Sequence, residues 1–236
     1  MAAPRDLAVT PIARLELAFA PRPWPFADAR RAEIDAHFAA LRRQKPALWN
    51  GRVLLMHRFA LSGATLRGAY LETDYASFLA WRDWGFPDRA MWNCFGMAAV
   101  RARDGAFLLG VMGAHTANAG QTYFAAGTAD PDDVVDGTVD LNGSVRRELA
   151  EETGLDADAM EAEPGWHAIF AGPRIAMMKV LRAREEAEPL RARVLRHLGR
   201  QAQPELAGVR LVRSHADIDA SFPSHVKAFF DYVWRP

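Results

Sequence analysis

Hydrophobic and polar positions follow two different periods along this chain, and the periods separate expected strands from expected helices. Alternation with a period of two residues predicts strands in ARLELAFAP, RVLLMHRFAL and ATLRGAYLE. Apolar residues three and four positions apart predict a helix within about residues 26–43, where Ile34, Phe38 and Leu41 share a face. A second, short helix is expected to begin at Asp74.

The rest of the chain repeats this mixture of strands and helices. FGMAAVRARDGAFLLGVM predicts two strands around an Asp-Gly turn, TYFAAG another strand, and HAIFAGPRIAMMKVLRA a hairpin through a Gly-Pro turn. Further helices are expected near Pro189 and Pro223, on either side of the strand GVRLVRS. The pattern predicts an α+β fold, which we divide into an N-terminal α/β region over residues 1–92 and a second domain over residues 93–236.

The run RRELAEETGL, over residues 146–155, places acidic side chains where a helix does not favour them. Glu148 and Glu152 lie four residues apart and therefore form a like-charge pair on one face. Gly154 is the expected helix stop, so Glu151 and Glu152 also lie in the last turn, where the helix dipole disfavours carboxylates. A bound divalent cation would offset both costs, and a solvated amphipathic helix is the alternative interpretation of the same charges.

The order of these residues resembles the sequence signature of the Nudix hydrolases, G-x5-E-x7-REUxEExGU, in which U is a bulky aliphatic residue. Residues 147–155 fit its second half at every specified position. The first half fits only with a longer loop, in which Gly127 becomes the signature glycine, Asp133 replaces the glutamate, and about six extra residues follow. The loop sequence DPDDVVDGT has the Asp, Gly and Pro content of an exposed turn, which tolerates such an insertion.

The resemblance implies a fold, a cofactor and a reaction. The implied fold is an α/β/α sandwich with a mixed central sheet, accompanied here by the smaller N-terminal α/β region. The implied reaction is the attack of water on a diphosphate linked to a nucleoside, assisted by Mg²⁺ or Mn²⁺.

The site residues that the resemblance implies lie on the acidic helix or in the loop before it. The implied metal ligands are Glu148, Glu151, Glu152 and Asp133. The implied catalytic residues are Glu148, Glu152 and Arg147, and the resemblance implies backbone roles for Gly127 and Gly154. Arg147 would orient Glu151, and Glu148 would bind the metal through water or accept the proton of the attacking water. Outside the signature, His115 and Tyr75 are candidate contacts with the substrate. The alternative for His115 is a loop histidine without a role in binding, and the alternative for Tyr75 is an aromatic residue of the core.

The N-terminal region carries a second likeness. ALWNGRVLLMHRF followed by ETDYASFLAW resembles the small Nudix-like N-terminal domain of the enzymes that hydrolyse UDP-sugars to UMP and a sugar 1-phosphate. Nucleotide sugars are therefore the first candidate substrates. ADP-ribose, dinucleotides and coenzyme A are alternatives with the same chemistry, and a regulatory nucleotide-binding module without activity is an alternative of another class.

Composition narrows the range of partners. A chain of 236 residues with 50% hydrophobic content can bury a sizeable core. Its 29 basic residues balance 29 acidic ones, so no net charge attracts it to nucleic acid. No apolar stretch is long enough to span a membrane, the single Cys94 excludes an internal disulfide, and cytoplasmic residence is the expected default. The expected partner is a small nucleoside diphosphate derivative, and the oligomeric state stays open.

Overall fold

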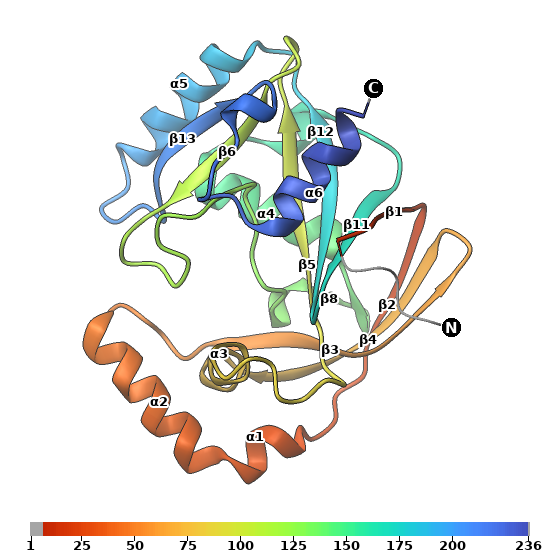
Figure 1. The fold of residues 1–236 in the computed structure, drawn as a ribbon, viewed down its shortest axis with the longest axis vertical. Helices are drawn as coiled ribbons and strands as arrows, with labels where there is room; N and C mark the ends of the chain where they lie inside the picture. Colours follow the sequence, from red (N-terminus) through yellow and green to blue (C-terminus); the bar gives the residue numbers. More distant parts are fainter. Residues whose placement is uncertain (1–6, 236) are drawn as a thin grey trace.

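The computed structural model describes residues 7–235 and contains two mixed β-sheets surrounded by helices (Figure 1). The larger sheet has the strand order β1-β11-β12-β5-β6-β13, with β7 beside β6 and β10 beside β12. Strands β5 and β12 are parallel, whereas the other neighbours are antiparallel. Its strands are β1 (Val9–Ile12), β5 (Asn93–Arg101), β6 (Phe107–Met112), β7 (Thr122–Tyr123), β10 (Glu161–Ala162), β11 (Trp166–Ala171), β12 (Arg174–Arg182) and β13 (Leu206–Val212).

The smaller sheet has the order β3-β4-β2-β9-β8, with β2 and β4 parallel and the other pairs antiparallel. Alternation along β3 gives this sheet two buried faces. Leu54 and Met56 join the core shared with the larger sheet, whereas Val53 and Leu55 pack toward the N-terminal helices. The strands are β2 (Arg14–Phe19), β3 (Arg52–Ser62), β4 (Thr65–Asp74), β8 (Val134–Val135) and β9 (Thr138–Val139).

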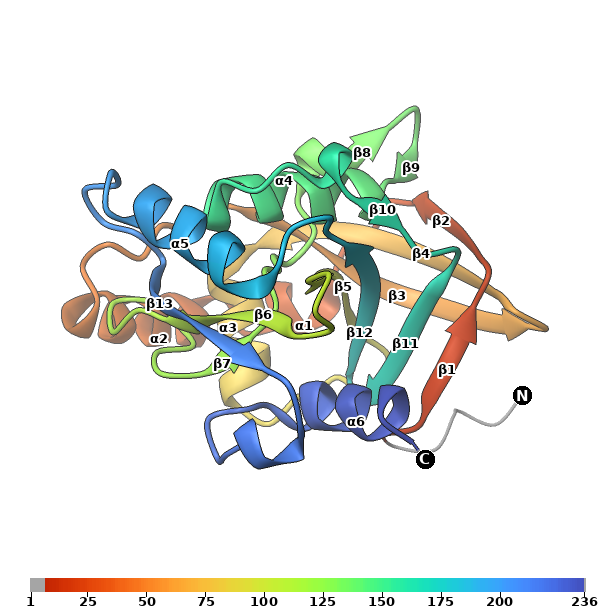
Figure 2. The same ribbon diagram turned by 90° about the horizontal axis from the view of Figure 1, so that it is seen from above.

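The helices lie in three groups. Helices α4 and α5 cover one face of the larger sheet and α6 covers the other (Figure 2), whereas α1, α2 and α3 cover the smaller sheet on the side away from the larger one (Figure 1). None of the helices in residues 7–235 is both long and apolar enough to cross a bilayer. The helices are α1 (Pro25–Ala29), α2 (Arg31–Gln44), α3 (Tyr75–Asp83), α4 (Leu141–Thr153), α5 (Ala187–Leu198) and α6 (Ser224–Val233).

The predicted α+β class, with a mixed sheet between helices, is confirmed. Strand pairing adds two features that the hydrophobic pattern did not indicate. Strand β1 pairs with β11 in the larger sheet, and the loop DPDDVVDGT contains strand β8, whose hairpin with β9 joins β2 in the smaller sheet. Both sheets therefore contain strands from both sides of residue 92, and the division into two domains stays a prediction.

Helix α4 carries the acidic residues and lies close against β5 at Gly96. A Cβ atom at Gly96 would lie 2.5 Å from Cγ2 of Val145, so a side chain there would push the helix off the sheet. The Asp140 side chain accepts a hydrogen bond of 3.0 Å from the Asn142 N–H and caps the start of the helix. Packing and capping together fix where the helix places its side chains.

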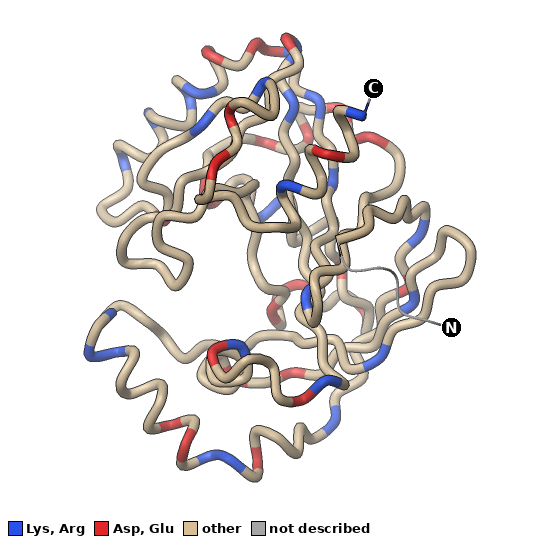
Figure 3. The backbone as a smooth tube through the Cα atoms, viewed as in Figure 1, with Lys and Arg blue, Asp and Glu red and all other residues tan. Residues whose placement is uncertain are grey.

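Basic and acidic residues are interspersed along the described chain rather than collected in one stretch (Figure 3). Many of them form ion pairs with each other on the surface, such as Arg67 with Glu16 and Arg103 with Glu186. Exposed pairs of this kind add little stability.

Candidate active site

Helix α4 directs its glutamates to one cavity with a volume of about 380 Å³. The side chain of Glu148 is 15% exposed, Glu152 is 5% exposed, and the side chain of Glu151 is 63% exposed at the rim. Glu205, which precedes β13, lines the same cavity. The other residues that line it are Gln201, Ala202 and Gln203, so the lining combines four acidic residues with neutral ones and no basic side chain.

Burial makes ionisation of the two inner glutamates costly. It raises the pKa of Glu148 to about 7, an effect that the charges of Glu151 and Glu205 increase and that Arg147 opposes. Burial also raises the pKa of Glu152 well above its usual value, with further contributions from Glu148 and Glu205. The cavity therefore concentrates negative charge that the protein compensates only in part.

Glu152 is also short of hydrogen-bond donors. Its Oε1 accepts a hydrogen bond of 3.4 Å from the Ala126 N–H, whereas its Oε2 is buried and has no partner among the described residues. A hard divalent cation prefers such carboxylate oxygens, so the donor set fits Mg²⁺ or Mn²⁺ in its chemistry. Within residues 7–235, no three His, Cys, Asp or Glu side chains are gathered closely enough to hold a metal ion. Ligation would require these carboxylates to converge.

Arg147 joins helix α4 to the loop that precedes it. Its Nη2 donates hydrogen bonds to Asp130 at 3.2 Å and Asp133 at 3.1 Å, and its Nη1 donates to Glu148 at 3.0 Å. The same Nη1 lies 3.7 Å from the Glu151 carboxylate. Burial opposes the charge of Arg147, but the carboxylates of Glu148, Asp133 and Asp130 raise its pKa, so it is always a cation.

Asp133 is buried, with 3% of its surface exposed, although its loop has the composition of an exposed turn. Its Oδ1 accepts the hydrogen bond from Arg147, and its Oδ2 accepts one of 3.1 Å from the Asp130 N–H. Both carboxylate oxygens therefore have a donor. The contacts make Asp133 a support for Arg147, and its role as a metal ligand stays a prediction.

The two glycines of the signature both lie against site side chains. A Cβ atom at Gly127 would lie 2.1 Å from Oε1 of Glu148, so only glycine leaves room for that carboxylate. Gly154 ends α4 with a φ of 68°, in the left-handed region that favours glycine, and a Cβ there would meet Nδ1 of His197 at 2.5 Å. His197 in turn hydrogen-bonds to the backbone oxygen of Glu151 at 3.1 Å.

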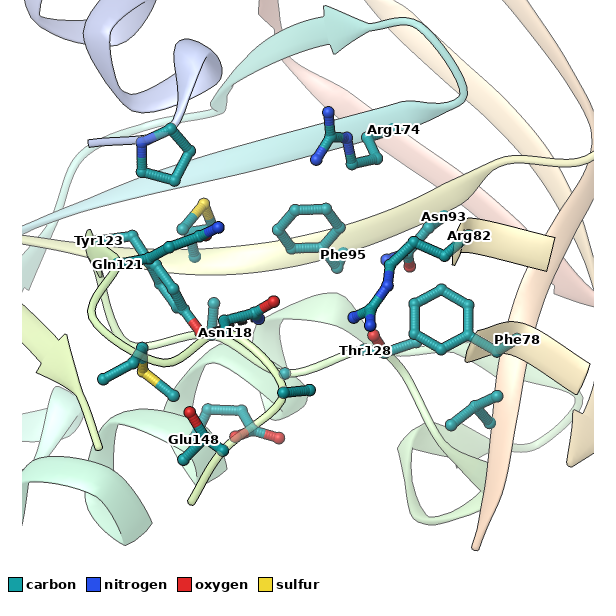
Figure 4. A pocket seen from close by; sticks show the side chains of 18 of the residues that line it. Phe78, Arg82, Asn93, Phe95, Asn118, Gln121, Tyr123, Thr128, Glu148 and Arg174 are labelled. Atoms are coloured by element: carbon teal, nitrogen blue, oxygen red, sulfur yellow. Dashed lines mark hydrogen bonds between the residues drawn. The ribbon is translucent and has the colours of Figure 1, made fainter. Parts of the chain in front are cut away.

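A second pocket, of about 330 Å³, adjoins the acidic cavity, because Glu148 and Glu205 line both (Figure 4). It lies between the N-terminal region and the larger sheet and receives side chains from α3, β5 and β12. Tyr75 is one of its lining residues, whereas His115 is not among them. The other side chains important here are Phe78, Arg82, Asn93, Phe95, Arg174 and His225.

The polar lining residues that sequence reasoning missed include Glu205, Arg82, Asn93, Arg174 and His225. They lie far apart in the sequence and converge only in the folded chain. Asn93 and Arg174 are the first residues of apolar strands, and Glu205 immediately precedes one. A polar residue at the start of a buried strand is the one signal that could have indicated three of them.

Comparison with known proteins gives structural likenesses only. No family model and no curated protein matches the sequence. The MutT protein from Methanosarcina mazei is 20% identical, with a TM-score of 0.41 over 60% of this chain and 91% of that chain. RenU, a Nudix hydrolase from M. smegmatis, is 15% identical, with a TM-score of 0.38 over 59% of this chain and 81% of that chain.

A third likeness is to a larger enzyme, a bifunctional NMN adenylyltransferase/ADP-ribose pyrophosphatase from Francisella tularensis in complex with AMP and Mn. It is 14% identical, with a TM-score of 0.39 over 60% of this chain, and this chain spans 41% of its length. At these identities and scores, none of the likenesses bears on substrate or mechanism.

The buried glutamates make stability depend on pH. Because the pKa of Glu152 is raised in the folded chain, its contribution to stability is complete below its unfolded pKa and is lost as pH rises through the folded value. We expect Glu152→Gln to raise the melting temperature in EDTA, and the gain to be larger at pH 8 than at pH 5. Thermal unfolding at both pH values measures this, with Glu188→Gln, 68% exposed, as the matched control. An equal gain in melting temperature at both pH values would contradict a raised pKa of Glu152 in the folded chain.

Proposed function

We propose that this chain hydrolyses the phosphoanhydride bond of a nucleoside diphosphate derivative with the help of Mg²⁺ or Mn²⁺. The observation that carries the proposal is the burial of Glu148 and Glu152 beside a cavity with an acidic and neutral lining, which adjoins a second pocket. A buried carboxylate such as that of Glu152, which contacts no cationic side chain among the described residues, suits a divalent cation, and such a cation commonly links carboxylates to substrate phosphates. The resemblance of residues 147–155 to the Nudix signature supports the same reaction.

The side chains divide the work between binding and proton transfer. A divalent cation, when bound, would neutralise the diphosphate and lower the pKa of a coordinated water. Glu151 and Glu152 would supply oxygen ligands, and Glu148 would bind through water or accept the proton of the attacking water. Glu205 is a second candidate for that proton, because it faces the same cavity from outside helix α4. Arg147 would hold the Glu148 carboxylate in place through its bond of 3.0 Å.

Nucleotide sugars are the first substrates to test. The likeness of the N-terminal region to that of UDP-sugar hydrolases motivates this choice, and α3 of that region lines the pocket beside the glutamates. UDP-glucose would be cleaved between its phosphates to UMP and glucose 1-phosphate. ADP-ribose, dinucleotides and coenzyme A contain the same bond and belong in the same substrate panel.

The first test of activity uses this panel with and without a divalent cation. We expect hydrolysis in Mg²⁺, none in EDTA, and recovery when Mg²⁺ is restored. Glu152→Gln should lower kcat by about 100-fold or more while the fold persists, because it removes a charged ligand at nearly constant volume. Products are separated by chromatography, and Glu188→Gln, on the exposed face of α5, is the control.

The same measurements separate the proposal from its alternatives. Full activity in EDTA would reject the metal site. Binding of nucleotides without turnover under any of these conditions would instead identify a nucleotide-binding module. Equal rates on UDP-glucose and ADP-ribose would leave the hydrolase in place and remove the preference for nucleotide sugars.

Asp133 should act through Arg147. Replacing Asp133 by Asn removes the charge that faces the guanidinium at 3.1 Å, so Arg147 should hold Glu148 less firmly. We expect the rate to fall by about 10–100-fold or the Mg²⁺ requirement to rise. Steady-state kinetics across a range of Mg²⁺ concentrations measures both effects, and Asp132→Asn, at an exposed neighbouring position, should behave as wild type. Unchanged kinetics in Asp133→Asn would show that the loop supplies no support.

Gly127 should be indispensable for the position of Glu148. A methyl group at Gly127 would overlap the Glu148 carboxylate and force it to move. We expect Gly127→Ala to reduce kcat by about tenfold or more with little change in melting temperature. Gly208→Ala is the control, because a Cβ there meets nothing within 4 Å. Wild-type kcat in Gly127→Ala would mean that Glu148 does not need its present position.

A further inference from the structure

The pocket between the N-terminal region and the larger sheet carries charges of both signs. Glu148 and Glu205 are its acidic residues, and both also line the acidic cavity, so they lie at the end that opens to it. Arg82 from α3 and Arg174 from β12 are its basic residues; seen from Glu148 in Figure 4, Arg174 lies beyond Phe95 and Arg82 lies to one side, near Phe78 and Thr128. A ligand that fills the pocket therefore meets both signs of charge.

The two arginines also contact residues that do not line the pocket. The Nε of Arg82 donates a hydrogen bond of 2.8 Å to Asp83, which is not among the residues that line the pocket. His225 lines the same pocket, and burial together with the charge of Arg174 lowers its pKa to about 4, so it is neutral at physiological pH. Arg174 also lies over the ring of Phe86, with its Cζ 5.9 Å from the ring centroid.

Two buried polar atoms in this pocket point to a polar ligand. Asn93 is 7% exposed and its Oδ1 has no hydrogen-bond partner among the described residues. The same holds for Nδ1 of His225, which is 6% exposed. The ring of Phe95 lies 6.0 Å from that of His225 and presents an apolar surface between polar groups. Asn93 Oδ1 accepts hydrogen bonds only, so its natural partner is a hydroxyl or N–H group of a ligand.

We infer that this pocket selects substrates in which the group beyond the diphosphate is a hydroxylated ring that carries its own negative charge. The inference rests on the proposed function, because the glutamate end would hold the diphosphate with its cation. Arg82 and Arg174 would bind the distal anion, Asn93 would accept a hydrogen bond from a ring hydroxyl, and Phe95 would contact the face of the ring. A carboxylate of a sugar acid and a phosphate of a phosphorylated sugar share this chemistry.

The experiment compares pairs of probes that differ in the distal anion alone. UDP-glucuronate and UDP-glucose differ by a carboxylate in place of a hydroxymethyl group, and NADP⁺ and NAD⁺ differ by a ribose phosphate. Binding of each probe to the full chain carrying Glu152→Gln is measured by calorimetry in Mg²⁺, so that affinity is observed whether or not a probe can be hydrolysed. Wild-type kcat/KM is measured on the same probes.

In at least one pair, we expect the probe that has the distal anion to bind about tenfold or more tightly than the probe that lacks it. Adding Arg174→Gln or Arg82→Gln should bring that ratio close to one, and Arg174→Lys should retain part of it because it keeps the charge. In the same arginine variants, affinity for the probe that lacks the distal anion should change by less than about threefold. Arg103→Gln is the control, since Arg103 is exposed and pairs with Glu186 elsewhere on the surface.

Each other outcome overturns the inference or identifies the anion. A preference in one pair alone tells whether carboxylate or phosphate is recognised. Equal binding within both pairs, or no binding of any probe, overturns the inference. An equal loss of affinity for both members of a pair in the arginine variants also overturns it, because that result would place the diphosphate at the arginines. An arginine-dependent preference without hydrolysis in the wild-type chain would overturn the proposed function and leave the inference standing.

Discussion

Burial of Glu148 and Glu152 on one face of α4 is the interaction on which the rest of the structure depends. Two carboxylates four residues apart repel each other, and removing them from water raises the free energy of their charged forms further. The fold holds them there by close backbone approaches. Gly96 lets the helix lie against β5, and Gly127 leaves space beside the Glu148 carboxylate. Stability of the apo chain is given up where a cation can restore it.

Arg147 limits this cost without removing it. Its guanidinium bonds to Glu148 and to both aspartates of the preceding loop, so it neutralises one side of the cluster and ties the loop to the helix. No comparable cation contacts Glu152 among the described residues. The loop that carries Asp130 and Asp133 continues into the β8-β9 hairpin of the smaller sheet. This loop is therefore anchored at two points, by Arg147 and by β2, and connects the acidic helix to the smaller sheet.

Local sequence patterns predicted what local forces determine. The period of the apolar residues and the glycine stop indicated α4, and alternation indicated β3 and β4, because the relevant contacts lie within a few residues of each other. Composition misjudged Asp133, since a loop rich in Asp and Gly is typical of an exposed turn and only the distant Arg147 explains its burial. Glu205 and Arg174 had only a weak local signal, their position at the start of an apolar strand, because strand pairing across the larger sheet brings them to the pocket.

The pocket beside the acidic cavity brings the N-terminal region into the proposed site. One wall consists of residues from α3 and β3, and the opposite wall consists of residues from β5, β12 and α6. Asp74 caps α3 by accepting a hydrogen bond of 2.9 Å from the Ser77 N–H, and Arg31 of α2 binds the same carboxylate at 3.1 Å, so the N-terminal helices fix the orientation of α3. In the proposed function, the glutamates of α4 would define the bond that is hydrolysed but not the substrate that contains it. That choice would fall to the residues on both walls, which would make the smaller sheet and its helices part of the proposed site.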